Sequence, residues 1–206
     1  DLVEPHLGAI VPHASHGFAP INAALWTEGW FVYVPRGVRV EQPLQIPARA
    51  PRGEGPCERT LIVCEEESRL EFIDGCTAPI YTYWTALSSV IEVAVKRGAH
   101  CRLTSIQNGA RNVSRFDVMS ARAHGEALME LNVLRLGGDR SDVQPSTYLV
   151  GPGAQTEIWT ASLGLAREAI TASGQAIHCA PQTRSRIVNK SVSEGGLGPG
   201  NRSLVE

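Results

Sequence analysis

Apolar and polar residues alternate along most of this chain with the period of two that is typical of β-strands. Four segments show the pattern as two short runs around a polar turn: TLIVCEEESRLEFIDG, SVIEVAVKRGAHCRLTSIQN, FDVMSARAHGEALMELNVLRLGG and STYLVGPGAQTEIWTASLGL. The spacing of apolar residues that helices require is weak by comparison. The pattern therefore predicts an all-β fold.

The turns within these segments recur at a near-constant spacing. Turn glycines fall at Gly98, Gly125 and Gly153, and the first segment has Ser68 at the matching position. A two-strand unit that recurs about every thirty residues is typical of repeat architectures. We therefore predict a β-solenoid, in which each coil buries its inner side chains by stacking on the next, and we keep a β-sandwich as the main alternative.

Glycine and proline clusters predict where the strands are interrupted. The segment from Gln42 to Pro56 is expected to be the most exposed loop, and GGLGPG, residues 195–200, a mobile loop or a crossing between coils. In FIDGCTAP, residues 72–79, Asp74 and Gly75 indicate a turn that ends a strand. This interpretation places Cys76 at a bend, either as a core filler or as a thiol presented for chemistry.

Composition narrows the classes of function. The chain has 206 residues, 43% of them hydrophobic and 19% charged, which is typical of a folded protein with a sizeable core. A formal net charge of -2 argues against unspecific nucleic-acid binding. No stretch approaches ~18 apolar residues, so we expect no membrane span, and no secretion signal is visible. The chain begins at Asp1 and ends within a strand pattern, so we expect a fragment of a longer protein.

The five cysteines are widely spaced and include no C-x-x-C pair: Cys57, Cys64, Cys76, Cys101 and Cys179. This usage predicts reduced thiols in an intracellular protein and argues against a structural zinc site. Cys101 and Cys179 are expected to fill the core, as free thiols commonly do.

Two histidine-containing segments carry residue types that can bind a metal. His178 and Cys179 are neighbours on a predicted strand, so their side chains point to opposite faces and are not expected to share a metal. HASH, residues 13–16, is interpreted as a solvated loop.

Several blocks of the sequence resemble the SufB/SufD family of iron–sulfur cluster assembly scaffolds, and SufB most closely. They occur in family order from about Leu7 onward and are WFVYVPRGVRVEQPLQ, ERTLIV, DGCTAPIY, SIQN and AIHCAPQTRSRIVNKSVSEGG. The resemblance implies a right-handed parallel β-helix core that spans residues 1–206 as a single domain, without the C-terminal region that docks the ATPase. It implies a scaffold rather than an enzyme, because ATP hydrolysis would belong to a SufC-like partner.

The same resemblance implies cargo, partners and site residues. The cargo would be a transient Fe–S cluster, and the partners a SufC-like ATPase, a SufD-like or SufB-like subunit and a sulfur-donating desulfurase system in the cytoplasm. Neither nucleic acid nor a membrane is implied. Cys76 would accept persulfide sulfur or ligate the cluster, and Arg49 and Gln107 would line an interior route for sulfur.

Side-chain parity bears on Gln107. In HCRLTSIQN the alternation places Arg102 and Thr104 outside, and Leu103, Ser105 and Gln107 inside. An amide on an apolar interior face requires hydrogen-bond partners. Gln107 therefore either bonds turn backbone of the next coil or lines a polar channel.

The chemistry expected of Cys76 depends on its thiolate, since the thiolate is the nucleophile. Its pKa would have to fall below the usual value, which the backbone N–H groups of a turn would favour and the carboxylate of Asp74 would oppose. A persulfide formed there is reversible and could pass its sulfur on.

Three departures from the SufB pattern favour an alternative. Gly109 stands where tryptophan is usual, Pro51 where asparagine is usual, and no lysine lies between Phe116 and Ala121. A SufD-like or degenerate, non-catalytic partner subunit is therefore the second hypothesis. A polysaccharide-binding or polysaccharide-cleaving β-helix is the third, which lacks support because no carboxylate is expected to recur at the coil period.

Overall fold

The structure is a computed structural model that describes residues 2–11, 18–48, 57–165, 168–194 and 200–205. These ranges contain one short helix and a series of strands. The elements are α1 (Ala19–Leu25), β1 (Phe31–Val34), β2 (Leu44–Ala48), β3 (Cys57–Cys64), β4 (Arg69–Thr77), β5 (Thr85–Val95), β6 (His100–Gly109), β7 (Val113–Ala123), β8 (Leu128–Gly137), β9 (Arg140–Leu149), β10 (Gln155–Leu165), β11 (Ala169–His178), β12 (Arg184–Glu194) and β13 (Gly200–Val205).

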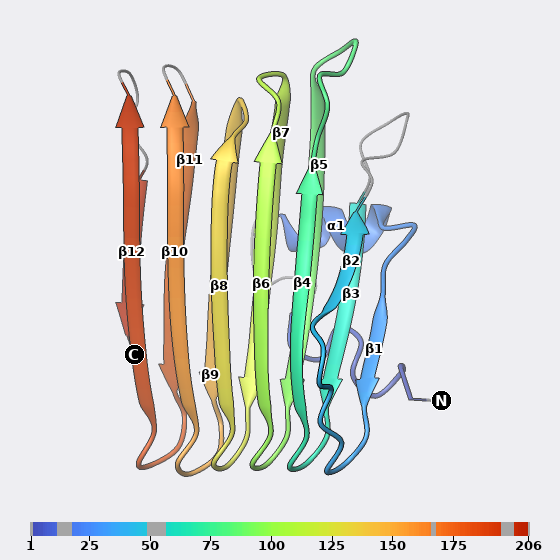
Figure 1. The fold of residues 1–206 in the computed structure, drawn as a ribbon, viewed down its shortest axis with the longest axis vertical. Helices are drawn as coiled ribbons and strands as arrows, with labels where there is room; N and C mark the ends of the chain where they lie inside the picture. The colour runs from blue at the N-terminus through green and yellow to red at the C-terminus, as the bar shows by residue number, and fades with distance from the viewer. Residues whose placement is uncertain (1, 12–17, 49–56, 166–167, 195–199, 206) are drawn as a thin grey trace.

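The strands form two parallel sheets that face each other (Figure 1). One sheet has the order β1-β3-β5-β7-β9-β11-β13 and the other the order β12-β10-β8-β6-β4-β2. Consecutive strands alternate between the sheets, and each strand pairs in parallel with the strand two places along the chain. The chain therefore coils as a β-solenoid, as the repeat predicted, and the parallel pairing excludes an antiparallel sandwich.

A residue with left-handed backbone occurs once in each turn along one side of the stack. These residues are Gly37, Glu67, Gly98, Glu126, Gly153 and Gln182. The predicted turns at Gly98, Gly125 and Gly153 were therefore confirmed, while Ser68 directly follows its turn; the left-handed residue itself is Glu126 rather than Gly125, and Glu67 rather than Ser68. The sequence reveals a left-handed turn position only where that position is filled by glycine. At Glu67 and Glu126 a residue with a side chain adopts the same backbone conformation, so the sequence gives no such signal.

Glu126 offers a small gain in stability. Its φ of 58° costs a non-glycine residue roughly 1 kcal/mol. Glu126→Gly is expected to raise the free energy of unfolding by about 0.5 kcal/mol, because relief of strain exceeds the added entropy of the unfolded chain. Urea unfolding measures this. Gly98→Ala, at the equivalent turn, is expected to change stability in the opposite direction, and a less stable Glu126→Gly variant would contradict the argument.

The interior is apolar near these turns. Phe72, Leu103, Leu131 and Ile158 form one row across β4, β6, β8 and β10, and each is at most 2% exposed. Inward side chains of β3, β5 and β7 complete the same cluster. Each coil therefore buries its inner apolar side chains by stacking them on the in-register side chains of the next coil, which no coil could do alone.

The N-terminal segment covers the outer face of the other sheet. Phe18 stacks on Phe116 of β7 with ring centroids 4.1 Å apart, and Ala19 packs in a buried cluster with Val90 and Val118. Apolar residues at outward positions of β5 and β7 are thus removed from water. None of the helical structure in the described part of the chain has the length and apolar character of a membrane span.

A buried ion pair holds this segment in place. Glu92 of β5 and Arg59 of β3 have 0% and 2% exposed side chains, and Arg59 Nη2 lies 2.7 Å from Glu92 Oε1. The carboxylate of Glu92 also accepts hydrogen bonds of 3.0 Å from the backbone N–H groups of Gly8, Ile10 and Val11. The Glu92 carboxylate therefore links two strands to the N-terminal segment.

Some predicted loops fall on strands or outside the described ranges. The expected loop from Gln42 to Pro56 contains β2, which pairs with β4, so this prediction was wrong for residues 44–48. Residues 49–56, the HASH segment and residues 195–199 of GGLGPG lie outside the described residues.

Candidate functional site

Cys76 lies within β4 rather than at a bend. Gly75 pairs with Ile106 and Cys76 with Gln107, so the Asp-Gly pair here is extended backbone. The predicted turn was wrong because β2 and β6 flank β4 on both sides, and their hydrogen bonds outweigh the local turn preference of Asp-Gly. The Cys76 side chain is 7% exposed and faces the coil interior.

A row of polar side chains runs along the coil axis from Cys76. The in-register partners on successive strands of the sheet are Gln107, Arg135, Ser162 and Ser191. The neighbouring interior row contains Asp74, Ser105, Val133, Thr160 and Asn189. Half of the interior is therefore lined with polar groups, parallel to the apolar rows nearer the turns.

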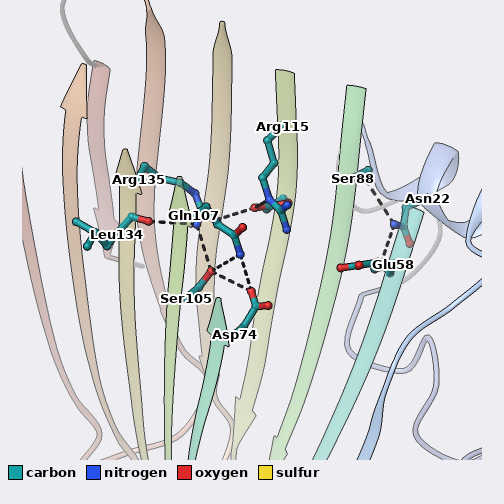
Figure 2. A network of polar contacts seen from close by, with 10 residues as sticks. Asn22, Glu58, Asp74, Ser88, Ser105, Gln107, Arg115, Leu134 and Arg135 are labelled. Atoms are coloured by element: carbon teal, nitrogen blue, oxygen red, sulfur yellow. Dashed lines mark hydrogen bonds and ion pairs between the residues drawn. The ribbon is translucent and has the colours of Figure 1, made fainter. Parts of the chain in front are cut away.

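Hydrogen bonds connect the members of these rows (Figure 2). Gln107 Nε2 donates to Asp74 Oδ2 at 2.9 Å, and Ser105 Oγ donates to the same oxygen at 3.1 Å. Arg135 Nη1 donates to Ser105 Oγ at 3.2 Å. Gln107 is 4% exposed, so its inward parity was predicted correctly, and its amide bonds the polar interior rather than turn backbone.

Asp117 of β7 joins this network to the opposite sheet. Its Oδ2 accepts from Arg135 Nη2 at 2.8 Å and from Arg115 Nε at 2.7 Å. Burial lowers the pKa of Arg135 to about 10. Burial also acts to lower the pKa of Arg115, but the carboxylates of Asp117 and Asp74 raise it above its usual value. Both guanidinium groups therefore remain charged inside the coil.

Of the buried side-chain polar atoms without a hydrogen-bond partner among the described residues, four lie in this half of the interior: Gln107 Oε1, Asp117 Oδ1, Arg135 Nε and Ser162 Oγ. All four belong to inward-facing side chains of this polar half. Leaving such an atom unpaired costs about 1–3 kcal/mol. The polar interior therefore offers hydrogen-bond partners to a small polar guest, which the apolar half does not.

A pocket opens beside the Cys76 thiol. Its cavity volume is about 10 Å³, close to the room that one water molecule needs, and its lining includes Cys76, Gln107, Arg115, Arg140 and Ser141. The rest of the wall is formed by Ala78, Leu87, Asn108, Gly109, Val113, Gly137 and Gly138. The sulfur is thus buried yet faces a space that leads to solvent.

The electrostatics of Cys76 differ from the expectation. Burial raises the pKa of the Cys76 thiol, and the carboxylates of Glu58, Asp74 and Asp117 raise it further. The guanidinium of Arg115 acts in the opposite sense and is the largest favourable influence on the thiolate. The lowered pKa that the thiolate chemistry requires is therefore not present: Asp74 opposes it as expected, and the expected help from the backbone N–H groups of a turn is missing because the sulfur lies within a strand.

The structure describes some of the other positions that the sequence analysis singled out, but not all of them. Arg49 and Pro51 lie outside the described residues, so the role of Arg49 stays a prediction. Gly109 lines the pocket, and a Cβ there would lie 3.2 Å from the Cα of Gly138. Ala121 is fully buried in the apolar core. The positive charges of this interior therefore come from arginines, not from a lysine between Phe116 and Ala121.

Sequence reasoning missed Arg115, Asp117 and Arg135. A usable signal existed, because each is a charged residue at the inward parity of a predicted strand. Arg135, for example, follows Met129, Leu131 and Val133 at alternate positions of β8. A charged residue at an apolar parity indicates a buried polar site.

The remaining cysteines divide into core and surface. Cys64 and Cys101 are 0% exposed, and a hydrogen bond to Cys64 together with burial raises the pKa of Cys101. Cys101 is therefore a core thiol, as predicted. Cys179 is exposed, so its predicted burial was wrong. His178 bonds the hydroxyl groups of Thr183 and Ser185, and the described residues contain no group of three potential metal ligands.

A row of charged residues of both signs occupies the outer face of the sheet. Glu71, Arg102, Glu130, Glu157 and Arg186 are in register across β4, β6, β8, β10 and β12. The expectation that no carboxylate recurs at the coil period was therefore wrong. Arg102 nevertheless pairs with Glu71 and Glu130, and Glu130 also contacts His100, so these carboxylates are engaged in ion pairs rather than forming an open acidic site for a sugar or Ca²⁺.

Known proteins are similar to this chain over nearly its whole length. Residues 48–198 match the family model described as "SUF system FeS cluster assembly, SufBD core domain", and residues 1–46 match the SufBD protein N-terminal region. An iron–sulfur cluster assembly protein SufB of Bacillus subtilis is 38% identical over 197 residues. SufBD family proteins of Staphylococcus haemolyticus and Staphylococcus epidermidis are 36% and 35% identical over the same length. Each alignment covers 95% of this chain but 42% of the relative, so the chain spans less than half the length of these relatives.

Proposed function

The chain belongs to the SufBD family of iron–sulfur cluster assembly proteins, and from this premise we propose that it is a SufB-like scaffold that receives sulfur on Cys76. The observation that carries the proposal is the polar row that begins at Cys76 and continues through Gln107 and Arg135 along the coil axis. A structural thiol would need neither a pocket nor polar neighbours. Cys64 and Cys101, which lie among aliphatic side chains, illustrate that inert case.

The proposed step is a thiol–persulfide exchange. The Cys76 thiol first loses its proton to solvent, and its thiolate attacks the terminal sulfur of a donor persulfide, R–S–SH. A new S–S bond forms at Cys76, the S–S bond of the donor breaks, and the donor cysteine leaves as a thiolate with the bonding electrons. The products are Cys76–S–SH and R–S⁻, so atoms and charge balance and no oxidant is required.

The polar interior supports onward movement of sulfur. Arg115 favours an anion at the pocket, and Arg135 and the unpaired atoms of Gln107 and Ser162 continue the polar lining along the axis. The cluster is the cargo of this system rather than a resident cofactor. In the complete assembly we propose a SufC-like ATPase, a SufD-like or SufB-like second subunit and a desulfurase system as partners.

Replacing Cys76 with serine tests the proposal. After incubation with a cysteine desulfurase system and L-cysteine, mass spectrometry is expected to locate a persulfide on Cys76 of the wild-type chain and none at this position in Cys76→Ser. Cys179→Ser is the matched control, because this thiol is exposed, lies after β11 and is not part of the polar row, and the change should leave labelling of Cys76 unchanged. Wild-type chain that carries no persulfide on Cys76 would rule out the acceptor role.

A SufD-like, non-catalytic subunit is the second candidate. The observations that favour it are the raised pKa of Cys76 and the glycine at position 109. The same labelling experiment separates the two candidates, since a non-catalytic subunit would take up no sulfur on Cys76.

A further inference from the structure

The loop of residues 78–84, between β4 and β5, presents large apolar side chains to solvent. Ile80 is 82% exposed, Tyr83 81% and Trp84 60%. Ile80 and Tyr83 are the most exposed large hydrophobic residues of the described chain, and only three residues lie between Ile80 and Trp84. Single exposed apolar residues are normal on protein surfaces, but a cluster of exposed aromatic and aliphatic side chains indicates an interaction surface.

This aromatic loop, residues 78–84, is held in a defined shape. Asn112 Nδ2 donates to the carbonyl oxygens of Tyr81 at 2.6 Å and Tyr83 at 3.1 Å. Trp84 Nε1 donates to Asp139 Oδ2 at 3.2 Å, and the Ala78 N–H donates to the carbonyl of Asn108 at 2.9 Å. The exposed side chains are therefore presented on an ordered backbone, which reduces the entropy cost of binding a partner.

The same loop forms one wall of the Cys76 pocket. Ala78 and Leu87 line the pocket, and Tyr81 packs against the buried cluster that these two residues form with Val113. Ala78 is also two residues beyond Cys76 in sequence. A protein that bound the exposed side of the aromatic loop would therefore have its surface next to the mouth that leads to the sulfur.

Positive charge lies beside this surface. Arg111 is exposed in the turn that also contains Asn112, and Arg140 is exposed and lines the pocket. Asp139, which precedes Arg140 in the sequence, already accepts hydrogen bonds from Trp84 Nε1 and Ser114 Oγ. The surface thus combines an apolar centre with basic neighbours, which complements a partner whose apolar contact region is edged by acidic residues.

We infer that the aromatic loop, with Arg111 and Arg140, is the docking surface for the protein that donates sulfur to Cys76. The occupant is a carrier protein with a cysteine persulfide near an acidic edge. The inference rests on the proposed function, because a docking site beside the pocket serves no purpose if Cys76 receives no sulfur. Docking would cover the pocket mouth during the exchange and keep the persulfide from solvent thiols.

The test compares a protein donor with a small-molecule donor. A Tyr83→Ser/Trp84→Ser variant and an Arg111→Glu variant are incubated either with a cysteine desulfurase, its sulfur-carrier protein and L-cysteine, or with cysteine hydropersulfide. Mass spectrometry measures the initial rate of persulfide formation on Cys76. Val192→Ser is the matched control, since Val192 is 63% exposed on β12, remote from the loop.

The double variant is expected to be labelled about tenfold more slowly by the carrier protein, because buried aromatic anchors carry much of an interface's binding energy. Arg111→Glu is expected to slow labelling most at low salt, since an interface charge acts mainly on association. Labelling by cysteine hydropersulfide should stay within about twofold of wild type in all variants, and Val192→Ser should match wild type with both donors.

Three results would overturn the inference. Equal rates for the double variant and wild type with the carrier protein would exclude docking on the loop. An equal loss with both donors would mean that the loop shapes the pocket instead of binding a partner. A wild-type dimer that the double variant converts to a monomer, in sedimentation without donor, would assign the surface to a second copy of the chain. Wild-type Cys76 that neither donor labels would refute the proposed function itself.

Discussion

Replacing Glu92 with alanine is expected to lower the free energy of unfolding by about 3–5 kcal/mol, the usual effect of breaking a buried ion pair. The Glu92 side chain is fully buried and accepts from the Arg59 guanidinium and from three backbone N–H groups of the N-terminal segment. Alanine would leave the Arg59 charge and these donors without their acceptor in a region that excludes water. Urea unfolding monitored by circular dichroism measures the difference.

Two further variants serve as controls, one for the volume of the Glu92 side chain and one for the loss of an exposed ion pair. Glu92→Gln keeps the volume and can still accept some of the backbone bonds, so its loss should be smaller than that of alanine. Glu71→Ala removes an exposed carboxylate whose pair with Arg102 is 3.7 Å long, and should change stability by less than about 1 kcal/mol. If Glu92→Ala were no less stable than Glu71→Ala, the buried pair would not be what holds the N-terminal segment.

The fold could be predicted because the repeat is visible in the order of apolar, polar and turn residues along the chain. Alternation along each strand and the near-constant distance between Gly98, Gly125 and Gly153 are enough to indicate stacked coils. The exact turn residues were less accessible, because Glu126 adopts a left-handed conformation that sequence preference assigns to glycine. The strand at residues 44–48 was missed because Pro47 indicates a loop, whereas its position beside β4 allows pairing on one side.

The site was only partly predictable from sequence. Parity placed Gln107 inside, and the structure agrees. The position of Cys76 could not be predicted in the same way, since Asp-Gly favours a turn unless neighbouring strands impose an extended backbone. The network through Asp117 joins β7 to β8 across the interior. Such contacts depend on how two sheets face each other, which no pattern along a single strand reveals.

Arg115→Met is expected to slow the reaction of Cys76 with iodoacetamide on the order of tenfold at neutral pH. Burial already raises the pKa of this thiol, and Arg115 is the main charge that acts in the opposite sense. Alkylation requires the thiolate, so its rate rises with pH as the thiol ionises. Without the guanidinium charge the pKa rises further, and the whole rate profile moves to higher pH, since loss of an attraction of about 1.4 kcal/mol corresponds to a tenfold change in ionisation.

The variant should still fold, because Asp117 keeps its ion pair with Arg135 at 2.8 Å when Arg115 is replaced. Arg115→Lys retains a positive charge at the pocket and should restore most of the reactivity, which a purely structural role of the arginine would not predict. Alkylation at Cys76, followed by mass spectrometry across a pH series, compares the three proteins. An identical pH profile for wild type and Arg115→Met would show that the guanidinium does not act on the sulfur. If the profile shifts as expected, the arginine that sequence reasoning overlooked sets the fraction of Cys76 able to attack a persulfide, and the buried charges of this interior then serve sulfur chemistry rather than stability alone.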